Sequence, residues 1–97
     1  MVSHIVLFQF GESTTEEQKS ELIGKLKSLQ EEIPGIDNLK VGKDFTNRSK
    51  GYDIGLFVDF SNVESFEQYG PHPKHQEVVA YLQEIGVKDV IVNDFQS

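Results

Sequence analysis

Tyr52-Asp53-Ile54-Gly55-Leu56-Phe57-Val58-Asp59-Phe60 is the stretch of the chain that decides the fold. Successive side chains of a β-strand point to opposite faces of a sheet, so strict alternation indicates a strand with one buried side. The residues of one face are Tyr52, Ile54, Leu56, Val58 and Phe60, and those of the other are Asp53, Gly55, Phe57 and Asp59. We therefore expect a strand over residues 52–60 that lies on a hydrophobic core.

The remaining segments can be assigned around this strand. β-Branched and aromatic residues predict a first strand over residues 2–10, with His4, Val6, Phe8 and Phe10 on one face and Ile5 and Leu7 on the other. Ser13-Thr14-Thr15 before Glu16-Glu17 is a capping-box pattern that starts a helix. Its apolar stripe is Leu22, Ile23, Leu26, Leu29 and Ile33, and Pro34-Gly35 ends it. The other expected elements are a strand over 36–45, a turn over 46–51, a short helix over 63–69, a helix from Pro73 that Gly86 stops, and a strand over 87–95.

This order of elements predicts an α+β fold of the ferredoxin-like βαββαβ type. Right-handed crossovers place the helices on one face of a four-stranded antiparallel sheet. The other face is then bare and carries Ile5, Leu7 and Phe57, an apolar patch that a soluble monomer seldom leaves open. We expect a symmetric homodimer that packs these two sheet faces together. With 97 residues, the chain is expected to form one domain over residues 1–97.

Composition excludes several classes of function. Nine basic residues are scattered among sixteen acidic ones, and the net charge of -7 argues against nucleic acid and anionic membranes as partners. The absence of cysteine excludes disulfides, thiol catalysis and thiolate metal sites. The first residues show no basic leader, cleavage site or membrane span, so residue 2 is interpreted as the start of the first strand and the protein is predicted to be cytoplasmic.

Proton-transfer chemistry concentrates in Tyr69-Gly70-Pro71-His72-Pro73-Lys74-His75, which holds two of the three histidines. Pro73 is expected in the first turn of a helix, with His72 as its cap and His75 in the same turn. The positive end of a helix disfavours an added positive charge, so a neutral imidazole that can accept a proton is plausible here. His4 shares its face with Val6 and Phe8 and points toward the same region.

The chemistry of these side chains has more than one reading. His75 and Tyr69 can serve as general base and acid on an enolisable carbonyl compound. They can equally be a helix cap and a core hydrogen bond, as buried polar groups need partners for structural reasons alone. The three histidines also suggest a zinc site, but no neighbouring carboxylate supports it, so no metal is predicted.

Several motifs together resemble one family over essentially the whole chain. They are His4-Ile5-Val6-Leu7-Phe8, Ile33-Pro34-Gly35-Ile36, Val41-Gly42, Lys50-Gly51-Tyr52, the segment 69–75 and Asp94-Phe95. In combination they resemble the stress-responsive dimeric α/β-barrel (Dabb) family. The resemblance implies a ferredoxin-like protomer that dimerises through its sheets, in agreement with the dimer expected from the apolar residues on the bare face of the sheet.

The resemblance also implies a ligand cavity. By similarity to a plant polyketide cyclase of this kind, it assigns catalysis to Tyr69 and His75 and cavity positions to His4 and His72. The implied apolar wall comprises Val6, Phe8, Leu22, Ile23, Leu26, Leu56, Val58, Val63 and Phe66. The chain departs from the cyclase pattern in the aliphatic residues Leu22, Ile23 and Leu26 and in Gly70, so a substrate preference does not follow.

Two main functions are therefore open. The first is a small homodimeric protein, stress-associated, that binds an apolar or poly-carbonyl ligand in this pocket. The second is an acid/base enzyme without a cofactor that carries out aldol cyclisation or isomerisation. A third, cofactor-free monooxygenation, is taken from other dimeric ferredoxin-like barrels and has no distinguishing residue here. No cofactor is expected in any of the three.

Overall fold

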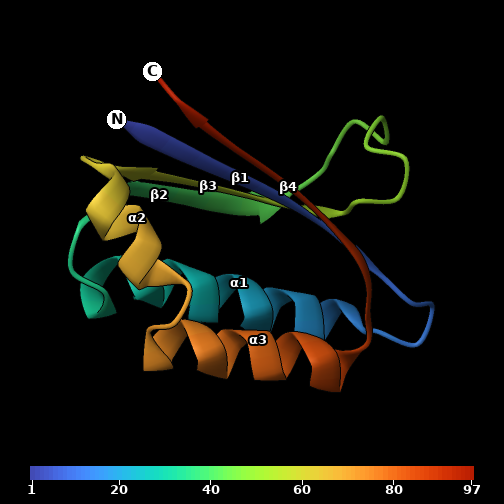
Figure 1. Cartoon of the computed structure of the whole chain (residues 1–97). Helices are drawn as coiled ribbons and strands as arrows, with labels where there is room; N and C mark the ends of the chain where they lie inside the picture. Colours follow the sequence, from blue (N-terminus) through green and yellow to red (C-terminus); the bar gives the residue numbers. More distant parts are fainter.

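The computed structural model describes residues 1–97, and its elements follow the expected order (Figure 1). They are β1 (Val2–Phe10), α1 (Glu16–Glu32), β2 (Ile36–Lys43), β3 (Ile54–Phe60), α2 (Val63–Tyr69), α3 (Pro73–Ile85) and β4 (Val87–Gln96). Figure 1 shows the sheet as one layer and all the helices beneath it, so one face of the sheet is covered and the other is open.

The four strands form one antiparallel sheet in the order β2-β3-β1-β4. β1 and β3 lie in the centre, and β2 and β4 are the edges. The register places Lys43, Ile54, Phe8 and Val90 in one row across the sheet. The predicted ferredoxin-like fold is confirmed.

Caps fix both long helices where the sequence places them. Thr15 is the N-cap of α1: its Oγ1 accepts from the Gln18 N–H at 3.1 Å, and the Gln18 side chain accepts from the Thr15 N–H at 2.9 Å. His72 is the N-cap of α3, and its Nδ1 accepts from the Lys74 N–H at 3.1 Å. Gly86 ends α3 in the left-handed conformation, with φ of 92°, which glycine adopts without a Cβ clash. The capping interpretations of the sequence are confirmed.

The core lies between the helices and the covered face of the sheet. Leu22, Ile54, Val58 and Phe60 are completely buried there. The open face differs, because Ile5, Leu7 and Phe57 are only half-buried. The alternation of residues 52–60 thus places one set of side chains in the buried core and the other set on an apolar face that nothing else in this chain covers.

Two predicted strand ends are wrong. β2 ends at Lys43 instead of Phe45, and β3 begins at Ile54 instead of Tyr52. The Asp44 carboxylate accepts from the Asn47 N–H at 2.8 Å and turns the chain out of the sheet. Phe45 therefore stands in the loop and is 95% exposed.

The two ends of the chain lie next to each other (Figure 1). The Ser97 N–H donates to the Met1 carbonyl at 3.0 Å, at the end of the β1–β4 ladder. None of the helices is both long enough and apolar enough to cross a membrane.

Candidate functional site

A cavity of about 250 Å³ lies between α3 and the sheet, at its β1–β4 side. Eleven of its fourteen lining residues are hydrophobic, and the polar ones include His4 and His75. The lining residues are His4, Val6, Phe8, Leu26, Leu56, Tyr69, His75, Val78, Val79, Leu82, Gln83, Val87, Val90 and Val92. An apolar cleft with a few polar groups at one place is the usual form of a small-molecule site.

Tyr69, the last residue of α2, supplies the most unusual group of the cavity. The residue is 2% exposed, and its hydroxyl has no hydrogen-bond partner. Its ring lies against those of His75, Phe60 and His4, at centroid distances of 4.5, 5.2 and 5.6 Å. Burial raises the pKa of Tyr69 to about 12, so the phenol stays neutral and keeps a proton to donate.

His75, in the first turn of α3, is held in one tautomer. Its Nδ1 lies 3.0 Å from the Gly70 carbonyl oxygen. A carbonyl can only accept, so Nδ1 carries the proton and Nε2 keeps a free lone pair. Burial lowers the pKa of His75, the Gly70 hydrogen bond partly opposes this, and the charges of His4 and His72 lower it further. The side chain is therefore a neutral imidazole near pH 7 and can accept a proton.

His4, on β1, has a carboxylate partner. Its Nδ1 lies 2.5 Å from Asp94 Oδ1, and the two residues are directly opposite each other in the β1–β4 register. The carboxylate can only accept, so it fixes a proton on Nδ1 and orients the ring. Sequence reasoning missed this contact, because it depends on which residues of β1 and β4 face each other.

The structure brings seven of the predicted site residues together at the cavity: Tyr69, His75, His4, Val6, Phe8, Leu26 and Leu56. Six others lie outside its lining. Leu22 and Val58 are buried in the core, Ile23 packs at its margin, and Val63 is 43% exposed on α2. Phe66 packs against His4 and Phe60, at ring distances of 6.0 and 5.7 Å, and His72 turns its Nδ1 to the α3 backbone.

The wall that sequence reasoning did not assign comes from α3 and β4. Val78, Val79 and Leu82 carry the helical apolar repeat of residues 73–85, and Val87, Val90 and Val92 come from the last strand. The repeat was visible in the sequence. It did not distinguish residues that fill the core from residues that border a cavity.

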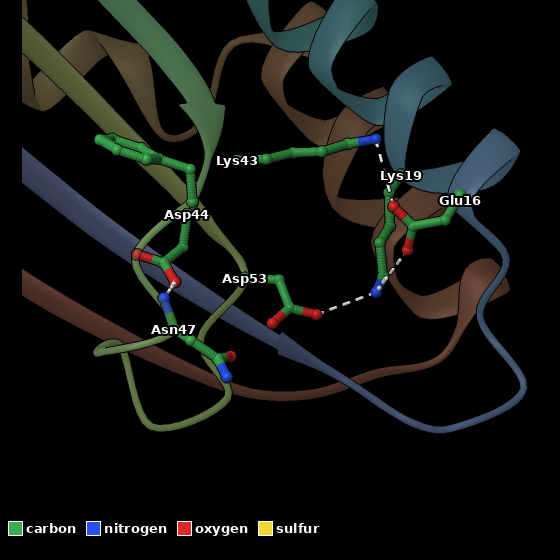
Figure 2. Close-up of a pocket in the computed structure, with 7 residues that line it drawn as sticks. Glu16, Lys19, Lys43, Asp44, Asn47 and Asp53 are labelled. Carbon is green, nitrogen blue, oxygen red and sulfur yellow. Dashed lines mark hydrogen bonds and ion pairs between the residues drawn. The ribbon is translucent and has the colours of Figure 1, made fainter.

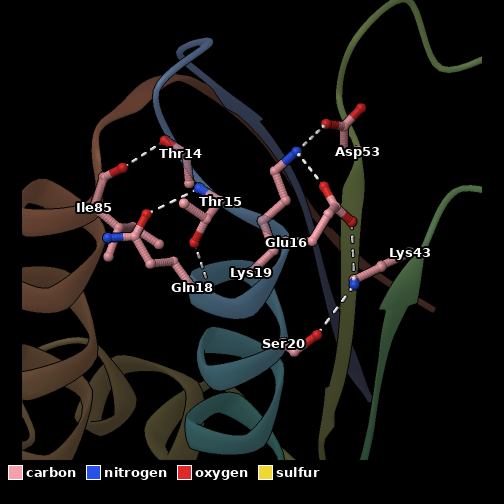
Figure 3. A network of polar contacts seen from close by, with 9 residues as sticks. All are labelled: Thr14, Thr15, Glu16, Gln18, Lys19, Ser20, Lys43, Asp53 and Ile85. Atoms are coloured by element: carbon pink, nitrogen blue, oxygen red, sulfur yellow. Dashed lines mark hydrogen bonds and ion pairs between the residues drawn. The ribbon is translucent and has the colours of Figure 1, made fainter.

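A second depression, of about 230 Å³, lies at the N-terminus of α1 and is almost entirely polar (Figure 2). Lys19 Nζ contacts Glu16 at 3.2 Å and Asp53 at 2.9 Å, and Lys43 Nζ contacts Glu16 at 3.3 Å and Ser20 at 3.1 Å. Figure 3 shows this network joining α1 to the ends of β2 and β3, while Thr14 bonds the Ile85 carbonyl at the end of α3. The two lysines are paired with Glu16 and Asp53 within the protein, so we interpret this cluster as a structural link between α1 and the sheet and not as a binding site.

No three His, Cys, Asp or Glu side chains are grouped so that they could hold a metal ion. The three histidines are each turned to a different partner: Asp94, the Lys74 N–H and the Gly70 carbonyl.

The fold and the cavity together define a ferredoxin-like α+β protein with a largely apolar cavity between α3 and the sheet. The model of one family, the Stress responsive A/B Barrel Domain (Dabb), matches residues 2–97, and the chain belongs to this family. The family resemblance seen in the sequence motifs is confirmed.

Two relatives are similar in sequence. Olivetolic acid cyclase of Cannabis sativa is 34% identical over 76 residues, which are 76% of this chain and 75% of the cyclase. A stress-response A/B barrel domain-containing protein of Arabidopsis thaliana is 36% identical over 67 residues, which are 68% of this chain but only 26% of that protein.

Solved structures agree with the fold. A dimeric ferredoxin-like protein of unknown function from Thermobifida fusca superposes with a TM-score of 0.87 at 26% identity, covering 99% of this chain and 90% of that one. At3g17210 of Arabidopsis thaliana gives 0.85 at 26% identity, covering 100% and 95%. A hydroxynitrile lyase from Passiflora edulis gives 0.84 at 20% identity, covering 97% and 90%, which is a likeness of fold alone.

Proposed function

We propose that the cavity binds a small, mainly apolar molecule whose carbonyl oxygen accepts a hydrogen bond from Tyr69. The buried hydroxyl of Tyr69, which has no partner in the protein, carries this proposal. Leaving a buried hydroxyl unpaired costs about 1–3 kcal/mol, so such a group is expected to have a partner in the working state. A carbonyl oxygen is an acceptor that fits an apolar cavity better than a charged group does.

The size and lining of the cavity limit the class of ligand. A volume of about 250 Å³ is below the usual range for drug-sized ligands and suits a compact molecule. Only His4, Tyr69, His75 and Gln83 offer side-chain hydrogen bonds, and all other lining residues are apolar. A ligand with one or two oxygens on a hydrocarbon body matches this distribution.

A matched pair of probes tests the proposal. Acetophenone and ethylbenzene have similar shapes, but only acetophenone has a carbonyl oxygen. We expect the protein to prefer acetophenone, and Tyr69→Phe to weaken acetophenone about tenfold while ethylbenzene is unchanged, the equivalent of one hydrogen bond. Isothermal titration or ligand-observed NMR measures both, with Tyr81→Phe as the control because that hydroxyl bonds Glu21 on the surface. Equal losses for the two probes would contradict the assigned role of Tyr69.

A second candidate function is proton transfer on the bound carbonyl compound, without a cofactor. It is favoured by the tautomer of His75, which leaves Nε2 able to accept a proton, and by the packing of its imidazole against the Tyr69 ring, with the two ring centroids 4.5 Å apart. His75 Nε2 would take the proton from the α-carbon, and the Tyr69 O–H would stabilise the negative charge that develops on the carbonyl oxygen. The resulting enolate can be reprotonated elsewhere, which is isomerisation, or attack a second carbonyl, which is aldol cyclisation. That one relative is a cyclase agrees with this chemistry.

Exchange of the α-hydrogens of acetophenone for deuterium measures this step directly. If the site is catalytic, the wild type accelerates exchange over buffer, His75→Ala lowers the rate at least about 100-fold, and Tyr81→Phe leaves it unchanged. Binding without any acceleration would restrict the function to ligand binding.

We further propose that the protein is a homodimer whose open sheet faces pack together. Ile5, Leu7 and Phe57 are half-buried on this face, and Ile91 and Phe95 of β4 are each 45% exposed. The similar protein from Thermobifida fusca is described as dimeric. Sedimentation velocity at micromolar concentration should show a dimer, and Phe57→Lys should shift it toward monomer because it buries a charge in the interface. A wild-type monomer would contradict the proposal.

A further inference from the structure

The ligand cavity is not closed within one protomer. On the α3 side Val78 and Leu82 are only 5% and 8% exposed, while Val79 is half-buried and Gln83 lies at the surface. On the β4 side Val90 and Val92 are 40% and 51% exposed, although both line the cavity. β4 is an edge strand, so nothing in the same chain lies beyond these valines. The cavity therefore has an apolar mouth over β4.

The opposite edge of the sheet presents an aromatic side chain with nothing to cover it. Phe45 is 95% exposed in the loop between β2 and β3. The loop is braced at its base: the Asp44 N–H donates to the Asp53 carbonyl at 2.7 Å, and the Tyr52 hydroxyl donates to Asp89 at 2.5 Å. The exposure of Phe45 is thus a property of an ordered loop, and an ordered loop loses little entropy when it docks.

The register puts these two features at the same level of the sheet. Lys43, the last residue of β2, is in the same row as Val90. Phe45 follows Lys43 by two residues. A second copy on the open face, with its β2 over β4 and the rows kept level, would bring its Phe45 loop to the β4 edge. Val90 and Val92 point to the helix side of the sheet, opposite Phe8 and Val6, so Phe45 meets them by reaching around this edge strand.

Two open sheet faces can pack about a two-fold axis that runs either across the strands or along them, and the position of Lys40 favours the axis along the strands. Lys40 pairs with Phe57 in the β2–β3 register and lies on the open face of the β2 edge. A two-fold axis across the strands would place β2 over the partner's β2, with Lys40 near its own copy, and like charges in an interface are unfavourable. An axis along the strands places β2 beside the partner's β4, keeps the rows level and separates the two lysines.

We propose that Phe45 of each protomer packs on Val90 and Val92 of the other and closes the mouth of the other's ligand cavity. Each site is then built from both chains. This inference rests on the proposed dimer through the open faces, and it adds a specific contact that the dimer alone does not require.

Introduced cysteines test the contact cleanly, because the chain contains none. In Phe45→Cys/Val90→Cys, mild oxidation should join two chains into a covalent dimer on a non-reducing gel. A bond within one chain is excluded, because three strand spacings separate the two edges by about 14 Å and a disulfide spans less than about 7 Å between Cα atoms. Lys40→Cys alone reports the other pairing and should stay uncrosslinked.

The dimer dissociation constant gives an independent measure. Phe45→Ser removes two apolar contacts from each dimer and should raise this constant about 100-fold, tenfold for each loop. Val63→Ser, which removes an exposed apolar side chain from α2, should leave it within about threefold. A dimer that does not crosslink through positions 45 and 90, or that crosslinks through Lys40→Cys, would overturn the inference alone, whereas a wild-type monomer would overturn the proposed dimer as well.

Discussion

Removal of the Tyr69 hydroxyl should make the protein more stable. In Tyr69→Phe the aromatic contacts with Phe60 and His75 remain, and only an oxygen without a hydrogen-bond partner is lost. Burying an unpaired hydroxyl costs about 1–3 kcal/mol, so we expect the free energy of unfolding of the ligand-free protein to rise by about 1–2 kcal/mol. For a domain of this size, that corresponds to a rise in Tm of roughly 4–16 °C.

Urea denaturation of the ligand-free protein at pH 7, followed by circular dichroism, measures this change. Tyr81→Phe is the matched control: its hydroxyl donates to Glu21 at 2.6 Å on the surface, and its loss should change stability by less than about 0.5 kcal/mol. Destabilisation by Tyr69→Phe of about 1 kcal/mol or more would show that the hydroxyl is satisfied in the free protein, and the argument for a ligand oxygen would fail.

The same variant has a second signature at high pH. The pKa of Tyr69 is raised to about 12 in the folded protein and is about 10 in the unfolded chain. The stability linked to this group is complete below pH 10 and is lost as the pH rises through 12, by about 3 kcal/mol in total. Tyr69→Phe lacks this loss, so its advantage over the wild type should widen between pH 10 and 12. An advantage that stays constant over this range would contradict the buried, neutral phenol.

Three further predictions concern His75 and the helix ends. Burial lowers the pKa of His75 from its usual value, so if the site is catalytic the rate of proton exchange on acetophenone should fall at low pH with a midpoint below 6.5. A midpoint above 6.5 in the pH–rate profile would contradict a buried neutral imidazole. Gly86→Ala should lower the free energy of unfolding by about 1–2 kcal/mol, because φ is 92° and the added Cβ would lie 3.2 Å from Thr14 Oγ1. Gly24→Ala in α1 has free space around the added Cβ and should instead raise the free energy of unfolding by about 0.5–1 kcal/mol. Urea denaturation that changed the stability of both variants in the same direction would refute this. Thr15→Ala removes the N-cap of α1 and should cost about 1 kcal/mol in the same assay, a cost that Thr15→Ser should largely avoid.

The fold could be predicted because local patterns and global topology agree. The alternation of residues 52–60 assigns the covered face of β3, and His72-Pro73 and Gly86 mark both ends of α3. The ends of the strands were harder to predict from the sequence. Asp44 leaves β2 through a side-chain hydrogen bond to Asn47, and an apolar Phe45 one residue later still resembles a strand.

The site could be predicted only in part. Face parity gave the direction of His4, and the segment 69–75 gave Tyr69 and His75, whose rings do meet at the cavity. Asp94 was missed because its contact with His4 depends on the long-range register of β1 and β4. The apolar stripe of α1 correctly predicted an inward face, and Leu22 is fully buried on it. The cavity-wall role of Leu22 came from the family resemblance alone, and Leu22 lies outside the lining of this cavity, because helical spacing identifies an inward face without showing which of its residues border a cavity.

The meeting of Met1 and Ser97 has a consequence for longer chains. A domain whose first and last residues are hydrogen-bonded neighbours takes up almost no length between its points of attachment. Such a unit can be carried within a larger polypeptide, as the Arabidopsis relative illustrates, of which only 26% aligns with this chain. It can also be opened at a surface loop and closed by a short linker without disturbing the sheet. For this fold, a circular permutant opened between β2 and β3 would keep its covered face and its cavity while releasing Phe45 from its brace.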